Sequence, residues 1–212
     1  MPELPRTALL TGAAKRLGRA MALMLAEEGF DIALHYHASA TEAEATAAEI
    51  RARGRRVLTI RADLAVEAEV RTIFARAAAL GPIGLLVNNA SIFELDRLAT
   101  LDPALLHRHI AINLTAPLLL CHDLVAQLPA AAEGLIVNML DERVHNPTPN
   151  YLSYTVSRTG LWGATQVMAR DLAPRVRVNA IGPGPAVPAP GWSRERFEKL
   201  CAQMPLQRGT SP

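Results

Sequence analysis

The chain has 212 residues, half of them apolar, and a formal net charge of +2. This length and apolar content fit one large hydrophobic core, so we expect a single domain over residues 1–212. Lysine and arginine are scattered along the chain and form no basic stripe, which argues against a nucleic-acid partner.

The sequence disfavours two further classes of protein. No apolar run is as long as a membrane span, and residues 1–6 lack the apolar core of a signal peptide. We therefore expect a cytoplasmic protein with no membrane partner. Cys121 and Cys201 lie far apart without metal-ligand spacing, which predicts buried thiols in a reducing compartment and no metal site.

The predicted elements alternate between strands and helices, which indicates an α/β fold with a doubly wound parallel sheet and helices on both faces. The predicted strands are Thr7–Leu10, Asp31–His35, Arg56–Arg61, Leu85–Asn88, Leu135–Asn138 and Val176–Ala180. The predicted helices are Arg19–Glu28, Thr41–Ala52, Val66–Leu80, Asp102–Leu128, Tyr151–Leu172 and Ser193–Gln203. After the sixth strand, the proline-rich segment 182–191 predicts a rigid loop in the position of a substrate lid.

A glycine-bearing turn follows the first strand, with the sequence Thr11-Gly12-Ala13-Ala14-Lys15-Arg16-Leu17-Gly18. The free backbone N–H groups at the start of a helix after such a turn bind phosphate, although similar turns also occur in proteins that bind no nucleotide. Gly12 lets the chain turn, and Gly18 lets the helix pack closely on the strand. Arg16 replaces the middle glycine of the pattern Thr-Gly-x-x-x-Gly-x-Gly, where its side chain can meet a phosphate directly.

The carboxyl ends of parallel strands carry ligands, so the residues after each strand predict the binding site. After the second strand, the run from His35 to Ser39 contains no acid to hold a ribose 2′-hydroxyl, whereas His37, Ser39 and Arg16 can hold a 2′-phosphate. This favours NADP over NAD. Asp63, followed by Leu64, offers a carboxylate for an adenine amino group or, alternatively, a helix cap.

The fourth strand ends in Asn88-Asn89-Ala90-Ser91-Ile92-Phe93. Phe93 stands in a loop beside a polar turn, which favours a ring that stacks on a planar ligand over an ordinary core ring.

Together these residues resemble the short-chain dehydrogenase/reductase family. The resemblance rests on Thr11-Gly12 with Gly18, the Asn88-Asn89-Ala90 turn, Asn113, Tyr154 and Pro183-Gly184. It implies a Rossmann-type fold and an NADP(H) cofactor. The cofactor-binding residues that it implies are Thr11, Gly12, Arg16, Leu17, Gly18, His37, Ser39, Asp63, Leu64, Asn89, Ala90, Ser91, Tyr154, Arg158, Pro183 and Gly184.

Within this family the chain is most similar to the pteridine reductases and the dihydrofolate or dihydromonapterin reductases. The similarity lies in Arg16, the His35-Tyr36-His37 run, Ala90-Ser91 followed by Phe93, and Asp141. Most of the family has a serine thirteen residues before the active tyrosine, and Asp141 stands there in this chain, as in the pterin-reducing branch. A solvated loop acid or a helix cap is the alternative interpretation of Asp141.

The chemistry of these residues points the same way. Tyr154 is the candidate acid that supplies a proton after hydride transfer, and Arg158, one helical turn later, places a cation near its phenol. The Asp141 carboxylate can accept two hydrogen bonds from an amino-pyrimidine edge or pass a proton to a ring nitrogen. Phe93, Asp141 and Tyr154 are the predicted substrate residues, and Asn113 is predicted to support the proton path.

The chain also departs from its family in three places. Arg158 stands where the family has lysine, and arginine does not give up its proton, so relay through residue 158 is not expected. Ala38 replaces an arginine that grips the 2′-phosphate in pterin-reducing relatives. The chain ends without the last helix and strand of such folds, so we expect either an incomplete chain or a sheet that lacks its last strand.

The sequence therefore predicts an NADPH-dependent reductase of a pterin or folate-like ring. Two alternatives remain: a short-chain reductase of a ketone or 3-oxoacyl substrate, and a non-catalytic dinucleotide-binding protein. The helices Asp102–Leu128 and Tyr151–Leu172 are apolar around much of their circumference. Relatives pair these helices between subunits, so a homodimer or homotetramer is expected.

Overall fold

The computed structural model describes residues 3–188 and 191–210. Its centre is a six-stranded parallel sheet with the strand order β3-β2-β1-β4-β5-β6. The strands are β1 Thr7–Leu10, β2 Asp31–Tyr36, β3 Val57–Arg61, β4 Leu85–Asn88, β5 Gly134–Met139 and β6 Val176–Ile181. The order reverses between β1 and β4, and the carboxyl ends of these two strands form the crevice where open α/β sheets bind ligands.

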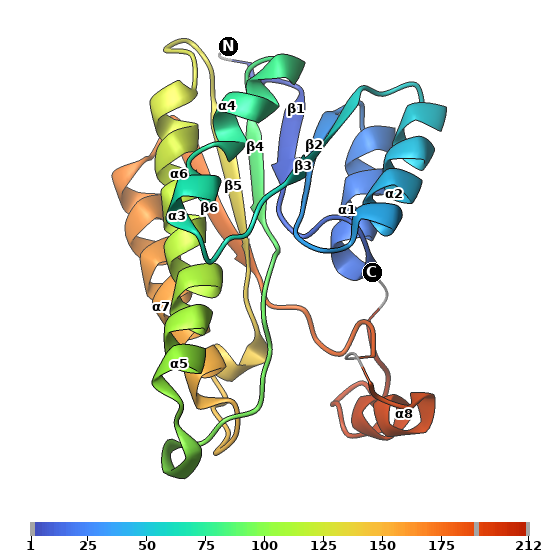
Figure 1. The fold of residues 1–212 in the computed structure, drawn as a ribbon, viewed down its shortest axis with the longest axis vertical. Helices are drawn as coiled ribbons and strands as arrows, with labels where there is room; N and C mark the ends of the chain where they lie inside the picture. Colours follow the sequence, from blue (N-terminus) through green and yellow to red (C-terminus); the bar gives the residue numbers. More distant parts are fainter. Residues whose placement is uncertain (1–2, 189–190, 211–212) are drawn as a thin grey trace.

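Within the described residues, eight α-helices connect and cover the strands. They are α1 Arg16–Glu27, α2 Ala40–Ala52, α3 Glu67–Val70, α4 Ile73–Ala77, α5 Pro103–Ile110, α6 Ala116–Gln127, α7 Leu152–Asp171 and α8 Arg194–Ala202. Figure 1 shows α1 and α2 on one face of the sheet and α3 to α7 on the other, with α8 apart at the end of the segment that follows β6. The predicted doubly wound α/β fold is therefore confirmed.

Two apolar clusters form the core, one on each face of the sheet. Side chains of α1 and α2 pack on one face around Leu10, Ile32 and Leu34. Side chains of α3, α4 and α6 pack on the other face around Leu9 and Leu86. Successive residues of β1 thus point to opposite faces, and both faces are buried, as expected for a parallel sheet.

All six predicted strands are present, with ends that differ by no more than one residue. The predicted helix 66–80 is wrong as a continuous element, because it is divided into α3 and α4. The Thr72 hydroxyl donates to the Glu69 carbonyl oxygen at 2.8 Å at this division, a local bond that competes with regular helix. The first helix begins at Arg16 rather than at the predicted Arg19.

The predicted helix 102–128 contains a π-helical turn, Ala111–Thr115, between α5 and α6. The sequence prediction that no apolar run is as long as a membrane span also needs correction. The helical segment Pro103–Gln127 is long and apolar enough by length and composition alone. Leu120 and Leu124 of this segment lie in the core against the sheet, which is the behaviour of a core helix. Both cysteines are buried free thiols, as predicted.

Candidate active site

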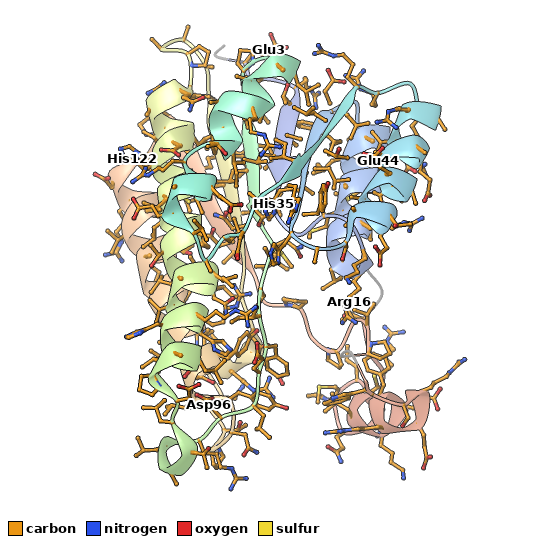
Figure 2. The ribbon with its side chains drawn as sticks, in the orientation of Figure 1. Glu3, Arg16, His35, Glu44, Asp96 and His122 are labelled. Carbon is orange, nitrogen blue, oxygen red and sulfur yellow. The ribbon has the colours of Figure 1, made fainter. Side chains whose placement is uncertain are left out.

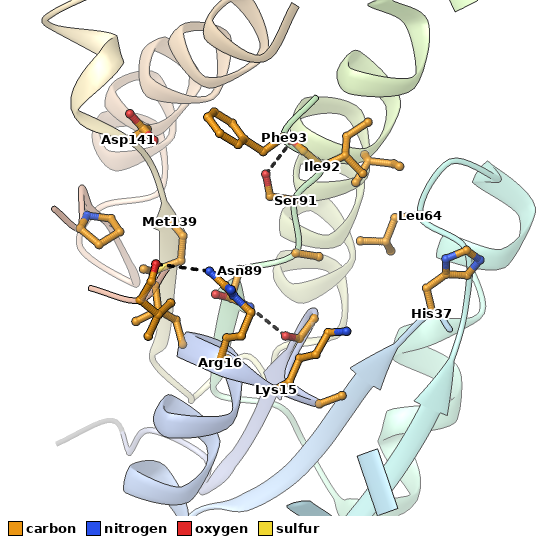
Figure 3. Close-up of a pocket in the computed structure, with 18 of the residues that line it drawn as sticks. Lys15, Arg16, His37, Leu64, Asn89, Ser91, Ile92, Phe93, Met139 and Asp141 are labelled. Carbon is orange, nitrogen blue, oxygen red and sulfur yellow. Dashed lines mark hydrogen bonds between the residues drawn. The ribbon is translucent and has the colours of Figure 1, made fainter. Parts of the chain in front are cut away.

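A cavity of about 620 Å³ lies at the carboxyl ends of the strands, across the point where the strand order reverses. Most of the residues predicted for the site line it. They are Gly12, Arg16, Leu17, Gly18, His37, Ser39, Asp63, Leu64, Asn89, Ala90, Ser91, Phe93, Asp141, Tyr154, Arg158, Pro183 and Gly184. Figure 3 shows Phe93 and Asp141 at one end of this cavity and His37 at the other, so the site is elongated.

The glycine turn leaves no room for side chains. Gly12 has φ +63°, and a Cβ there would lie 2.9 Å from the Cα of Ala90. A Cβ on Gly18 would lie 2.3 Å from the carbonyl oxygen of Gly12. Both glycines are therefore required by close backbone packing, which brings the first turn of α1 to the edge of the cavity.

Arg16 occupies an unusual backbone conformation at the start of α1. Its φ is +57°, in the left-handed region that favours glycine. This explains why the corresponding position of the common motif is a glycine, and it costs the fold about 1 kcal/mol. The guanidinium donates to the carbonyl oxygens of Val187 and Pro188, so it joins the glycine turn to the segment after β6.

The His35 side chain joins the glycine turn to the residue that follows β3 through two hydrogen bonds. Its Nδ1 accepts a hydrogen bond from the backbone N–H of Gly12 at 3.2 Å, and its Nε2 lies 3.1 Å from the carbonyl oxygen of Ala62. This arrangement requires the neutral ring with its proton on Nε2. Burial lowers the pKa of His35 to about 4, which keeps the ring in that form.

The end of the cavity near β2 and β3 carries polar side chains. His37 Nε2 lies 3.7 Å from Asp63 Oδ2, and Ser39 precedes α2. Asp63 Oδ1 also accepts from the backbone N–H of Ala65 at 2.9 Å. This bond stabilises a local turn. The alternative interpretation of Asp63 as a helix cap is wrong, because the N-cap of α3 is Val66 and has no side-chain cap. The second oxygen of Asp63 faces His37.

Of the predicted cofactor residues, Thr11 lies behind the cavity wall and Asn89 lines it. Thr11 is buried, and its Oγ1 accepts from the backbone N–H groups of Asn89 and Ala90 at 3.0 Å each. The Asn89 amide donates to the carbonyl oxygens of Thr11 and Gly12 at 2.9 and 3.0 Å. These bonds hold the loop after β4 against the glycine turn.

The other end of the cavity contains the predicted acid and carboxylate in direct contact. The Tyr154 hydroxyl donates to Asp141 Oδ2 at 3.0 Å. Asp141 Oδ1 accepts from the backbone N–H of Arg143 at 2.9 Å and from its guanidinium at 3.2 Å. Burial raises the pKa of Tyr154 to about 12; the Arg158 charge opposes this rise and the Asp141 charge adds to it.

Arg158 lies beneath Tyr154 on the next turn of α7. Only 2% of the residue is exposed, and its Cζ lies 5.5 Å from the centre of the Tyr154 ring. One guanidinium nitrogen donates to the carbonyl oxygen of Met139 at 3.0 Å. Its Nε is buried and has no hydrogen-bond partner among the described residues.

Phe93 is the aromatic wall of this end. Its ring stacks on Tyr151 with centroids 4.1 Å apart and meets the edge of the Tyr154 ring at 4.7 Å. The Arg143 guanidinium lies 5.4 Å from the Phe93 ring and 5.3 Å from the Tyr151 ring. Phe93 therefore contacts both Tyr154, the predicted acid, and Arg143, the residue that holds Asp141.

Asn113 lies in the π-helical turn and does not line the cavity. Its side chain accepts from the Ile92 N–H at 3.0 Å and donates to the Ile92 carbonyl oxygen at 3.1 Å and to the Ser157 hydroxyl at 3.2 Å. The Asn113 side chain therefore anchors the loop that carries Phe93. Its predicted part in a proton path remains a prediction.

Sequence reasoning missed two charged residues that line the cavity, Lys15 and Arg108. It also missed Arg143, which is not among the lining residues but holds the Asp141 carboxylate. Lys15 lies within the glycine turn between Thr11 and Gly18, so the sequence did indicate that it would lie near the cavity. Arg143 follows Asp141 by two residues, and a turn capped by the Asp141 carboxylate brings its guanidinium back onto that same group. Nothing in the spacing of Arg108 pointed to the cavity.

The residues present fit a bound dinucleotide. The glycine turn presents the start of α1, where helix N–H groups and the positive end of the helix dipole favour phosphate. The unpartnered Nε of Arg158 is a buried donor at the opposite end, suited to a hydroxyl oxygen of a ribose. The fold and this site define a dinucleotide-binding α/β protein in which a tyrosine hydroxyl contacts a carboxylate at one end of the cavity.

The sequence comparison gives the family. The short chain dehydrogenase family model matches residues 6–196, and the chain belongs to this family. The 3-oxoacyl-acyl-carrier-protein reductase FabG of Staphylococcus epidermidis is 31% identical over 207 residues, which cover 96% of this chain and 85% of that protein.

Solved structures resemble the chain more closely. FolM alternative dihydrofolate reductase 1 from Brucella canis, complexed with NADP, is 43% identical with a TM-score of 0.93; the match covers 97% of this chain and 82% of that one. A blue fluorescent protein from a metagenomic library, in complex with NADPH, is 33% identical with a TM-score of 0.89 and covers 97% and 85%. These complexes bear out the prediction of NADP(H) as the cofactor.

Proposed function

We propose that this short-chain dehydrogenase is an NADPH-dependent reductase of a pterin or folate-like ring. The observation that carries the proposal is the contact between the Tyr154 hydroxyl and the Asp141 carboxylate, with Phe93 beside them. A carboxylate at this place matches the hydrogen-bond donors of an amino-pyrimidine edge, and Phe93 offers an apolar surface to a flat ring. The 43% identity to FolM alternative dihydrofolate reductase 1 from Brucella canis supports the same substrate class.

When bound, NADPH supplies a hydride to the substrate. Tyr154 holds the proton that completes the reduction, and its phenol is protonated at neutral pH. The Arg158 charge beneath the ring lowers the cost of the phenolate that remains after proton transfer. Asp141 accepts hydrogen bonds and orients the ring, while Arg143 holds that carboxylate in place.

Binding of the cofactor is assigned to the rest of the cavity. We propose that the first turn of α1 and the Arg16 guanidinium hold the phosphates, and that His37 and Ser39 hold the 2′-phosphate. Asp63 faces the adenine end. The protein is further proposed to act in the cytoplasm as a homodimer or homotetramer.

A second candidate is reduction of a ketone or a 3-oxoacyl thioester by the same Tyr154. The 31% identity to the FabG protein of Staphylococcus epidermidis favours it. The contact between the Asp141 carboxylate and the Tyr154 hydroxyl argues against this candidate. Negative charge develops on the substrate oxygen beside this hydroxyl during carbonyl reduction, and the carboxylate would repel it.

Asp141 variants test the proposal. We expect Asp141→Asn and Asp141→Ser to lower kcat/KM for dihydrobiopterin by about 100-fold, because an oriented charge-assisted contact is lost. The neighbouring exposed Glu142→Gln is the matched control and should keep the wild-type rate. Unchanged ring reduction by Asp141→Ser, or a gain in ring reduction, would contradict the assignment. NADPH binding without turnover of any substrate would favour the non-catalytic alternative.

A further inference from the structure

The loop between β4 and α5 carries one wall of the ring site, and helix α7 carries the other. Phe93 lies on the loop, and Tyr154 lies in the first turn of α7. These two walls are far apart in the sequence, so their separation depends on contacts between the loop and the helix.

Asp96 makes the most extensive of these contacts. The residue is 3% exposed, and its carboxylate accepts the Ser153 backbone N–H at 3.2 Å on Oδ1 and at 3.1 Å on Oδ2. The Ser153 hydroxyl also donates to Oδ2 of this carboxylate. The Asp96 carbonyl oxygen accepts from the Tyr151 N–H at 2.9 Å. Figure 2 shows Asp96 at the lower end of the molecule, beyond the carboxyl ends of the strands.

The carboxylate thus lies at the first turn of α7, where the free N–H groups and the positive end of the helix dipole favour a negative charge. The N-cap position of α7 is Tyr151, which makes no side-chain cap and has φ +64°. Asp96 therefore replaces the missing local cap from 57 residues away in the sequence. Its backbone bond to Tyr151 and the stacking of Phe93 on that ring hold the strained residue.

The rest of the loop is fixed by two other contacts. Asn113 binds both backbone groups of Ile92, and His109 Nε2 lies 3.4 Å from the Glu94 backbone nitrogen, which donates to it. Phe93 stands between these two anchored residues, and Asp96 is the anchor that joins the loop to the helix of Tyr154.

We propose that Asp96 is a positioning residue whose carboxylate ties the 92–96 loop to the start of α7 and so fixes the gap between Phe93 and Tyr154. It touches neither substrate nor cofactor. This tie between the 92–96 loop and α7, which we call the clamp, sets how well a flat ring fits between Phe93 and Tyr154. Its effect on ring binding rests on the proposed function. The tie between loop and helix does not depend on which substrate is reduced.

The kinetic test compares three variants of the full chain: Asp96→Asn, Ser153→Ala and the control Asp31→Asn. Asp96→Asn keeps the size of the side chain but places an amide against the Ser153 N–H, and Ser153→Ala removes only the hydroxyl bond. We expect Asp96→Asn to raise KM for dihydrobiopterin about 10-fold and to lower kcat, with a smaller change of the same sign for Ser153→Ala. The Kd of NADPH, measured by its fluorescence, should stay within about twofold, because the phosphate end of the cavity is distant.

Asp31→Asn is the matched control. Asp31 is also a buried carboxylate, 6% exposed, but it lies at the start of β2, where it binds the Arg56 N–H at 3.0 Å. The Asp31→Asn variant should lose thermal stability and keep the wild-type KM for dihydrobiopterin. Equal kinetic losses in Asp31→Asn and Asp96→Asn, or an unchanged KM and kcat in Asp96→Asn, would overturn the proposal.

Amide hydrogen exchange separates failure of the clamp from failure of the proposed function. We expect faster exchange at residues 92–96 and 151–154 in Asp96→Asn than in wild type or Asp31→Asn, whatever the substrate. If wild type reduces no ring substrate, the proposed function fails and this exchange result still decides the clamp. Unchanged amide exchange of Asp96→Asn at residues 92–96 and 151–154 would overturn the proposed clamp.

Discussion

The two ends of the cavity are built in different ways. The phosphate end is made by a short continuous segment, in which Gly12 and Gly18 allow close backbone packing at the start of α1. The ring end is made by side chains from three separate segments, represented by Phe93, Asp141 and Tyr154. The comparison teaches that the geometry of the glycine turn is encoded locally, whereas the geometry at the other end depends on how distant segments are held together.

The largest expected effect is at the ring end. Tyr154→Phe removes the proton donor and should lower kcat by about 100-fold to 10,000-fold, as expected for loss of a general acid. Binding of NADPH, measured by fluorescence, should be retained, because the phosphate end is unchanged. Retention of kcat in Tyr154→Phe would show that another group donates the proton.

Acid is expected to lower the free energy of unfolding through His35, which hydrogen-bonds the glycine turn. Its folded-state pKa of about 4 lies below the usual 6.5, so the unfolded chain binds more protons between these pH values. The stability that the neutral ring contributes is complete above pH 6.5 and falls as the pH drops toward 4, by about 3 kcal/mol in total.

Denaturant unfolding of wild type and His35→Asn across this pH window measures the effect. The variant cannot gain that proton, so its free energy of unfolding should fall less steeply with acid. Equal slopes for the two proteins would contradict the assignment of a neutral His35 beneath the glycine turn.

Arg16 should show opposite effects on stability and binding. Arg16→Gly relieves the positive φ, which should raise the free energy of unfolding by about 0.5–1 kcal/mol. The lost cation should weaken NADPH binding by about 10-fold. Thermal unfolding without cofactor and a fluorescence titration measure the two effects. Tighter binding by the variant would exclude a phosphate role for Arg16.

The smallest effect is expected for Arg158→Lys. Lysine keeps the positive charge near Tyr154 but loses the planar group that reaches the Met139 carbonyl oxygen. We expect kcat to change by less than about 10-fold, since the electrostatic support of the phenol persists. A loss as large as that of Tyr154→Phe would show that the guanidinium has a role beyond its charge.

The sequence predicted the strands and the glycine turn well, because both are encoded by local patterns. The strand Thr7–Leu10 and the glycine turn are continuous segments whose spacing carries their structure. The ring end was predicted only in part. Asp141 and Tyr154 were placed by their spacing, but the Asp96 contact with Ser153 spans 57 residues and has no local signal. The π-helical turn at Asn113 was likewise invisible, because an inserted residue in an apolar helix leaves the composition unchanged.

The most direct test of the central claim is the rate of NADPH oxidation by wild type with dihydrobiopterin, dihydrofolate and a 3-oxoacyl thioester, each over a range of concentrations. The account predicts a kcat/KM for at least one of the two ring substrates that exceeds the thioester value by about 10-fold or more. Rapid reduction of the thioester, with no detectable oxidation of NADPH by either ring substrate, would contradict it.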